Sequence, residues 1–117
     1  MSGPKSELEL EITPNLAKCL ATLEGRSVAG RRMCLGIENQ RQDKRMNAAY
    51  KKALTRLSLE RQESLQQGQR AWIKFVVSQC DLEGGRSFGG TDSVDDRAYC
   101  DLHWRAYRAM FMETLDG

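Results

Sequence analysis

The chain has 117 residues and a mass of 13.3 kDa, which is enough for one domain with a small core and too little for a cofactor-binding domain plus a substrate domain. Hydrophobic residues make up 40% and charged residues 29%, which excludes collagen-like, low-complexity or disordered chains and favours a helical globular fold. The net charge of +2 produces no overall field that would select nucleic acid or an anionic membrane.

The charges are unevenly distributed along the chain. Residues 26–57 carry a local balance of +7, whereas residues 80–117 carry −4. We expect a dipolar fold in which the basic run is a solvated helix face; a surface for an acidic partner is the main alternative, and nucleic-acid binding the weakest. The longest nearly uncharged stretch, residues 72–82, is far shorter than the roughly 20 apolar residues that span a bilayer.

The first segments predict an arm followed by a short helix. The sequence ELELEIT alternates charged and apolar residues, which predicts an extended arm that packs on the domain or stays loose. The start of the chain lacks the basic and apolar regions of a secretory signal. Residues 1–4 are consistent with a leader joined to a mature chain. We therefore divide the chain into residues 1–12, a flexible arm or leader, and residues 13–117, a single helical domain. Thr13 and Pro14 predict a helix start, and Gly25 its end.

Two long helices are expected next. Ser27 is a candidate cap for a helix that runs to about Leu57, and its apolar period predicts an inner stripe of Asp43, Met46, Asn47, Tyr50, Leu54 and Leu57. Ser58 is a candidate cap for a third helix, in which Leu65, Gln69, Trp72, Val76 and Cys80 share one face. These two helices are predicted to be antiparallel neighbours.

A glycine-rich surface loop, EGGRSFGGTDS, separates them from a last helix. Ser93 or Asp95 is expected to cap this helix, whose inner stripe reads Tyr99, Leu102, Ala106 and Met110.

The four cysteines fall at segment junctions. Cys19 and Cys34 flank the first turn, and Cys80 and Cys100 flank the glycine-rich loop, which predicts two disulfides that each contribute about 3 kcal/mol. Free buried thiols are one alternative. A metal site built from Asp96, Cys100 and His103 is another, although the chain has one histidine and no CxxC pair. We assign no catalytic residue, no metal and no cofactor.

Two motifs carry a family resemblance. The sequence Asp43-Lys-Arg-Met-Asn-Ala-Ala-Tyr50 is followed by Gln69-Arg-Ala-Trp-Ile73, then by Cys80, a glycine-rich loop, Cys100 and Arg108. In this order they resemble the lysozyme inhibitor LprI-like family over about residues 19–111. Val76 and Val77 depart from the family pattern, which commonly has an Arg-Asp pair there, and Arg105 stands where a threonine is common.

The resemblance implies an exported, disulfide-linked, all-α protein of the bacterial envelope, periplasmic or secreted. The expected architecture is an antiparallel helical hairpin with flanking helices. The expected function is inhibition of a lysozyme-like, peptidoglycan-cleaving enzyme; the alternatives are an immunity protein for a secreted antibacterial toxin and a structural envelope module without an enzyme target. The expected partner is thus a protein, a lysozyme or a toxin, and neither nucleic-acid binding nor membrane insertion is expected.

The shared residues also have a structural interpretation. On antiparallel helices, Asp43, Asn47 and Tyr50 are expected to meet Gln69 and Trp72 in a partly buried hydrogen-bonded network, because buried polar groups need partners. We therefore expect the binding role in the loop, where Arg86, Ser87 and Phe88 offer a charged donor and an aromatic anchor between two cysteines that tether it. A plain surface loop is the alternative.

Overall fold

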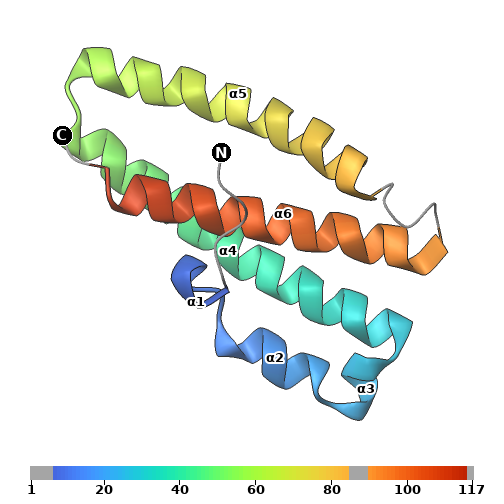
Figure 1. The fold of residues 1–117 in the computed structure, drawn as a ribbon. Coiled ribbons are helices and arrows are strands. Elements are labelled where there is room, and N and C mark those ends of the chain that lie inside the picture. The colour runs from blue at the N-terminus through green and yellow to red at the C-terminus, as the bar shows by residue number, and fades with distance from the viewer. Residues whose placement is uncertain (1–6, 85–89, 116–117) are drawn as a thin grey trace.

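The computed structural model describes residues 7–84 and 90–115, and within these ranges every element is a helix. In chain order these are α1 (Glu7–Leu10), α2 (Pro14–Leu20), α3 (Leu23–Arg26), α4 (Val28–Arg56), α5 (Leu59–Gly84) and α6 (Gly90–Glu113). The three long helices lie lengthwise in a body of 49 × 28 × 22 Å, and α1 to α3 flank them (Figure 1). The predicted all-α class is confirmed, and short helices flank the long ones as expected.

The order of the long helices in space differs from the prediction. α6 packs against both α4 and α5 and lies between them (Figure 1). α4 and α5 are joined by a tight turn at Leu57 and Ser58 and then diverge, without close backbone packing along their length. The expectation that these two helices are direct neighbours is therefore wrong, because the last helix of the chain occupies the place between them.

Serine caps set the starts of α4 and α5. The hydroxyl of Ser27 accepts a hydrogen bond from the Gly30 backbone N–H at 3.0 Å, and that of Ser58 accepts one from the Arg61 N–H at 3.3 Å. Each bond satisfies one of the donors that a helix N-terminus leaves free. Both predicted caps are confirmed, and α4 ends at Arg56, one residue before the predicted end.

The stripe of α4 that faces α6 is displaced from the predicted one. Its buried residues recur at helical spacing and are Leu35, Glu38, Gln42, Met46, Ala49 and Ala53. The buried residues of α6 include Leu102, Ala106, Ala109 and Met112, so alanines stand on both helices and let the two backbones approach closely. Of the predicted stripe, Met46 and Leu57 are buried, whereas Asn47 is exposed.

Oppositely charged segments of the chain meet across the α4–α6 interface. The Arg31 Nε lies 2.6 Å from the carboxylate of Asp95, and Arg45 pairs with Glu113 at 2.6 Å. The pairing with Glu113, assisted by the charge of Glu11, raises the pKa of the Arg45 guanidinium even though burial opposes this. Part of the basic run of α4 therefore forms ion pairs with α6, and the run is not only a solvated face.

Residues 7–12 do not form the extended arm expected from their alternation. They form the single turn of α1 and a bend in which Glu11 has a φ of 59°. Of the two alternatives left open, packing on the domain is the one found, because Leu10 and Ile12 are buried in a cluster with Leu16 and Leu35.

The segment from α2 to α3 also differs from its prediction. Thr13 occupies the N-cap of α2 with Pro14 at N1, as predicted, but its hydroxyl makes no capping bond. α2 ends at Leu20, and Gly25 lies inside α3, where a Cβ atom would overlap the carbonyl oxygen of Cys19. Gly25 is required for this close approach and does not end the first helix.

The last helix begins earlier than predicted. α6 starts at Gly90, so Ser93 and Asp95 lie inside it. Asp95 is 6% exposed and binds Arg31 of α4, so it anchors two helices and is not a cap.

Glu38 is a buried carboxylate that joins α2 to α4. It accepts hydrogen bonds from the Thr13 N–H at 2.8 Å, from the Thr13 hydroxyl, from Gln42 at 3.0 Å and from Arg41 at 3.0 Å. Burial by itself would raise the pKa of Glu38, but these four bonds outweigh it and lower the pKa below 4.5.

The contact at Gly30 gives a first prediction. A Cβ atom there would overlap the backbone carbonyl of Glu24, whereas nothing lies within 4 Å of a Cβ at Gly36 on the same helix. Gly30→Ala should lower the free energy of unfolding by about 1–3 kcal/mol, and Gly36→Ala should raise it by up to about 1 kcal/mol. Urea unfolding of the oxidised protein measures both. Equal effects of the two changes would contradict the close contact between Gly30 and the Glu24 carbonyl.

The Glu38 site gives a second prediction. The pKa of Glu38 is lowered in the folded state. Its contribution to the free energy of unfolding is therefore fully present above pH 4.5 and is lost as the pH falls below that value. Glu38→Gln should cost about 2 kcal/mol at pH 7, since one amide oxygen cannot accept four donors. The variant should also lose stability less steeply than the parent between pH 4.5 and 2.5. Urea unfolding at a series of pH values measures this. If the free energy of unfolding fell equally steeply with pH in the parent and the variant, Glu38 would not be the source of the pH dependence.

Candidate binding groove

An open groove runs between α4 and α5, and one face of α6 lines it. Its volume is about 770 Å³, and its lining residues are Asp43, Met46, Asn47, Tyr50, Gln66, Gln69, Arg70, Trp72, Ile73, Val76, Val77, Arg97, Asp101 and Arg105. These residues define what is called the groove below. They include Asp43, Met46, Asn47 and Tyr50 of the first motif and Gln69, Arg70, Trp72 and Ile73 of the second, so one feature of the fold gathers both motifs.

The two walls follow from helical spacing. Asp43, Asn47 and Tyr50 stand at i, i+4 and i+7 on α4 and therefore share one face. On α5 the wall is formed by Gln66, Arg70, Ile73 and Val77, which also share a face. Because α6 keeps the two helices apart, these faces point into open space and not into each other.

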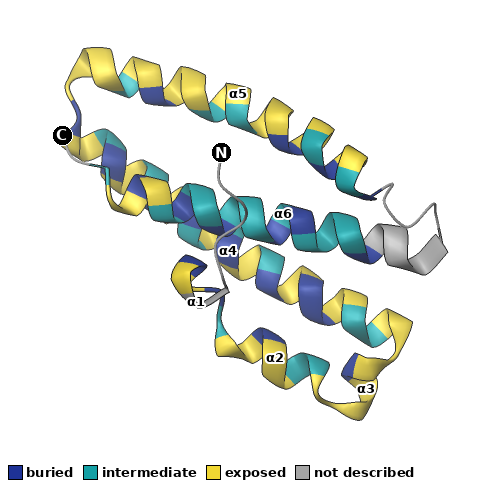
Figure 2. Cartoon of the chain, in the orientation of Figure 1, coloured by how far each residue is buried: buried dark blue, intermediate teal, exposed yellow. Residues whose placement is uncertain are grey.

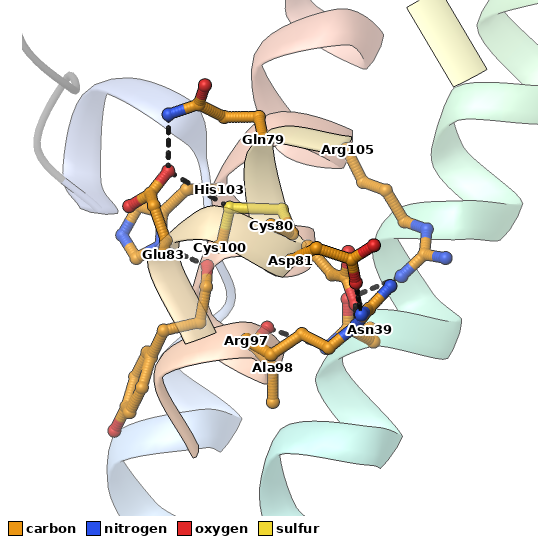
Figure 3. Close-up of a disulfide and its surroundings, with 12 residues drawn as sticks. Asn39, Gln79, Cys80, Asp81, Glu83, Arg97, Ala98, Cys100, His103 and Arg105 are labelled. Atoms are coloured by element: carbon orange, nitrogen blue, oxygen red, sulfur yellow. Dashed lines mark hydrogen bonds and ion pairs between the residues drawn. A yellow bond between two sulfur atoms is a disulfide. The ribbon is translucent and has the colours of Figure 1, made fainter. Parts of the chain in front are cut away.

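The floor from α6 is charged. Arg97 pairs with Asp81 of α5 and lies 4.0 Å from Asp101, while Arg105 lies 3.5 Å from Asp43 and donates to Asn39 at 2.7 Å (Figure 3). These side chains are 26–57% exposed, so each pair adds little stability. The pairs orient both arginines toward α4 or α5, and each arginine already shares its charge with an aspartate.

The apolar part of the groove lies along α5. Val76 is buried, whereas Ile73 is 51% and Val77 48% exposed. The Nε1 of Trp72 is buried without a hydrogen-bond partner in the described part of the chain. Exposed β-branched side chains beside a half-buried tryptophan leave apolar area that a binding partner can cover.

Gln69 links the three long helices. Its Oε1 accepts a hydrogen bond from Arg108 of α6 at 2.9 Å, and its Nε2 lies 3.8 Å from the sulfur of Met46 on α4. Burial lowers the pKa of the Arg108 guanidinium, which stays charged because its ordinary value is far above neutral.

The structure brings the five residues of the expected network to one place without joining them. Asn47 donates to Asp43 at 3.4 Å, but among the described residues no hydrogen bond connects Asp43, Asn47 or Tyr50 to Gln69 or Trp72. The polar groups of α4 therefore face the groove instead of fixing the register of α5.

Two disulfides are present, with the predicted pairing. Cys19–Cys34 joins α2 to α4 with a Cα–Cα distance of 5.7 Å, and Cys80–Cys100 joins α5 to α6 with one of 5.5 Å. The alternative metal set of Asp96, Cys100 and His103 therefore lacks its thiolate, and the described residues contain no cluster of three potential ligands. The proposed loop residues Arg86, Ser87 and Phe88 lie outside the described residues.

The second disulfide matters for the groove because α5 is thinly packed. Most of α5 is exposed, and its buried positions are Leu65, Val76, Cys80 and Gly84 (Figure 2). Figure 3 shows Cys80–Cys100 bridging the two helices beside the Asp81–Arg97 pair. The wall that carries Ile73 and Val77 is thus held to α6 by a covalent bond near its C-terminal end.

No helix in the described ranges has the length and apolar character needed to cross a membrane.

Comparison with known proteins identifies one family. A sequence model of the family described as Lysozyme inhibitor LprI matches residues 19–111. No curated protein and no solved structure matches the chain. The matched range includes all four cysteines and every residue that lines the groove.

The disulfides give a third prediction. Each closes a short loop, with sequence separations of 20 and 15 residues, so each double Cys→Ser change should cost about 3 kcal/mol. Loss of Cys80–Cys100 should also increase hydrogen exchange along residues 66–80, because few residues of α5 are buried. Loss of Cys19–Cys34 is the matched control and should leave that segment protected; the same exchange pattern in both variants would contradict this role.

Proposed function

Because the chain belongs to the lysozyme inhibitor LprI family, we propose that it binds a lysozyme-like, peptidoglycan-cleaving enzyme and restrains its activity through the groove. The family is one of inhibitors and not of catalysts, and the resemblance predicted from the two motifs is confirmed. The identity of the target enzyme and the use of the groove as contact surface are proposed.

One observation carries the proposal. The residues of both motifs line an open groove, with Asn47 exposed and Asp43 and Tyr50 half-buried. Asp43 and Gln69 also pair with arginines of α6, so part of the motifs serves the packing of the helices. Asn47, Arg70 and Ile73 are exposed, and a packing role does not account for them, which supports a role in binding a partner.

The shape of the groove limits how it can act. Lysozyme-type enzymes cut a glycan in a cleft between two carboxyl groups, and a concave groove cannot plug a concave cleft. The groove fits a protruding helix or loop beside such a cleft. Once the inhibitor is seated there, the wall formed by α5 stands over the cleft and obstructs the glycan.

Two disulfides in 117 residues support a site of action outside the cytoplasm, because disulfides persist in oxidising compartments such as the periplasm. We accordingly place the protein in the bacterial envelope or among secreted proteins.

Inhibition assays test the proposal. The oxidised protein is titrated into lysozymes and other muramidases acting on peptidoglycan, with direct binding recorded alongside and the reduced protein as control. Inhibition of at least one enzyme by the oxidised form is expected. Neither inhibition nor binding across the panel would reject the proposal in favour of a toxin partner or a structural role in the envelope.

Paired variants locate the surface and give a fourth prediction. Ile73→Lys places a charge in the groove, and Leu59→Lys makes the same change at an 83% exposed position of α5 outside it. Both should fold, but only Ile73→Lys should weaken inhibition, by about tenfold or more. The double change Arg86→Ala with Phe88→Ala tests the loop; if it abolishes inhibition while Ile73→Lys does not, the loop and not the groove is the contact surface.

A further inference from the structure

The structure contains two depressions beside α6, and the chain itself fills one of them. On the side where α4 and α6 meet the N-terminal segment, Leu10 and Ile12 are buried in the core. On the side where α4 and α5 diverge, the groove is open. The filled depression therefore shows, within the same molecule, what kind of segment such a surface accepts.

In the filled depression an arginine clamps an acidic, apolar segment. Arg45 donates from Nη1 to the Leu10 carbonyl at 2.5 Å and from Nη2 to the Glu11 carboxylate at 3.0 Å. Gln42 donates to the Glu11 carbonyl at 3.3 Å. The neighbouring side chains Leu10 and Ile12 go into the core. The Glu11 carboxylate therefore adds to that of Glu113 in pairing with Arg45, while the residues on either side of Glu11 cover the apolar surface.

The groove offers the same combination. Its apolar side consists of Trp72, Ile73, Val76 and Val77. Of its three arginines, Arg97 and Arg105 already face aspartates, whereas Arg70 is exposed and has no ion-pair or hydrogen-bond partner among the described residues. Arg70 stands on the same wall as Ile73, three residues away and therefore next to it on the helix.

We propose that the groove accepts a polypeptide segment of the inhibited enzyme in which an acidic residue lies beside apolar residues. Its carboxylate binds Arg70, and its apolar side chain packs on Ile73 and Val77. This inference rests on the proposed function and names the chemistry of the element that the groove recognises.

A glycan is the less favoured occupant. Sugar rings stack on exposed aromatic faces, and the aromatic residues of the groove, Trp72 and Tyr50, are both partly buried. The exposed apolar area comes instead from Ile73 and Val77, which suit side chains of a protein.

Peptide binding tests the inference without an enzyme. The probe is the hexapeptide LELEIT, the sequence of residues 8–13, and its charge-reversed control is LKLKIT. The chain's own copy keeps its own depression filled at high effective concentration, so added peptide samples the groove. The readout is the NMR signal of the Trp72 indole N–H, distinguished from that of Trp104 with a Trp104→Phe variant.

LELEIT should shift the Trp72 signal saturably, and LKLKIT should not. Arg70→Glu should abolish the shift, Arg70→Gln should weaken binding about threefold to fivefold, and Arg56→Glu, which makes the same charge change outside the groove, should leave it unaltered. Binding should weaken as salt rises. Equal shifts with both peptides, or none with either, would overturn the inference. So would a result in which an N-acetylglucosamine tetramer shifts the Trp72 signal and LELEIT does not.

The enzyme assay separates this inference from the proposed function. If an enzyme of the panel is inhibited and Arg70→Glu inhibits as well as the parent, the function stands and the groove chemistry is wrong. If LELEIT binds as described but no enzyme is inhibited, the groove chemistry stands and the proposed function is wrong.

Discussion

The position of α6 between α4 and α5 is the constraint on which the groove depends. Alanines at 49 and 53 on α4 and at 106 and 109 on α6 allow these two helices to pack closely. The Arg31–Asp95 pair joins them near the start of both helices, and the Arg45–Glu113 pair joins the middle of α4 to the end of α6. α5 then has no place against α4 and packs on the other side of α6. The polar face of α4 is left uncovered as a result, and the motif residues of the family stand on it.

The same arrangement explains why a small protein of this kind carries disulfides. Cys80–Cys100 holds the thinly packed α5 to α6, and Cys19–Cys34 holds the flanking helices to α4. At the corner between α3 and α4, Gly30 leaves room for the Glu24 carbonyl, and below it Glu38 ties α2 to α4 through Thr13. The two disulfides and the Glu38 hydrogen bonds thereby add to the stability of a core of modest size.

Local signals predicted the helices, and non-local packing decided the site. Ser27, Ser58 and the cysteine positions are short-range features, which is why the bounds of α4 and the disulfide pairing agree with the sequence. The prediction missed the inward face of α4 because its buried residues include Glu38 and Gln42, which bind Thr13 and Glu11, two residues far away in the sequence. The groove follows from the place of α6, which no single helix encodes; the signal available was that Asp43, Asn47 and Tyr50 form a polar face on a long helix.

The central claim is that an inhibited enzyme contacts the groove. Hydrogen–deuterium exchange of the oxidised protein, alone and with such an enzyme, measures this directly, because backbone amides at an interface are protected. The account predicts new protection in residues 43–50 and 66–77, with little change in α2 and α3. Protection confined to residues 83–95, or to the flanking helices, would contradict it.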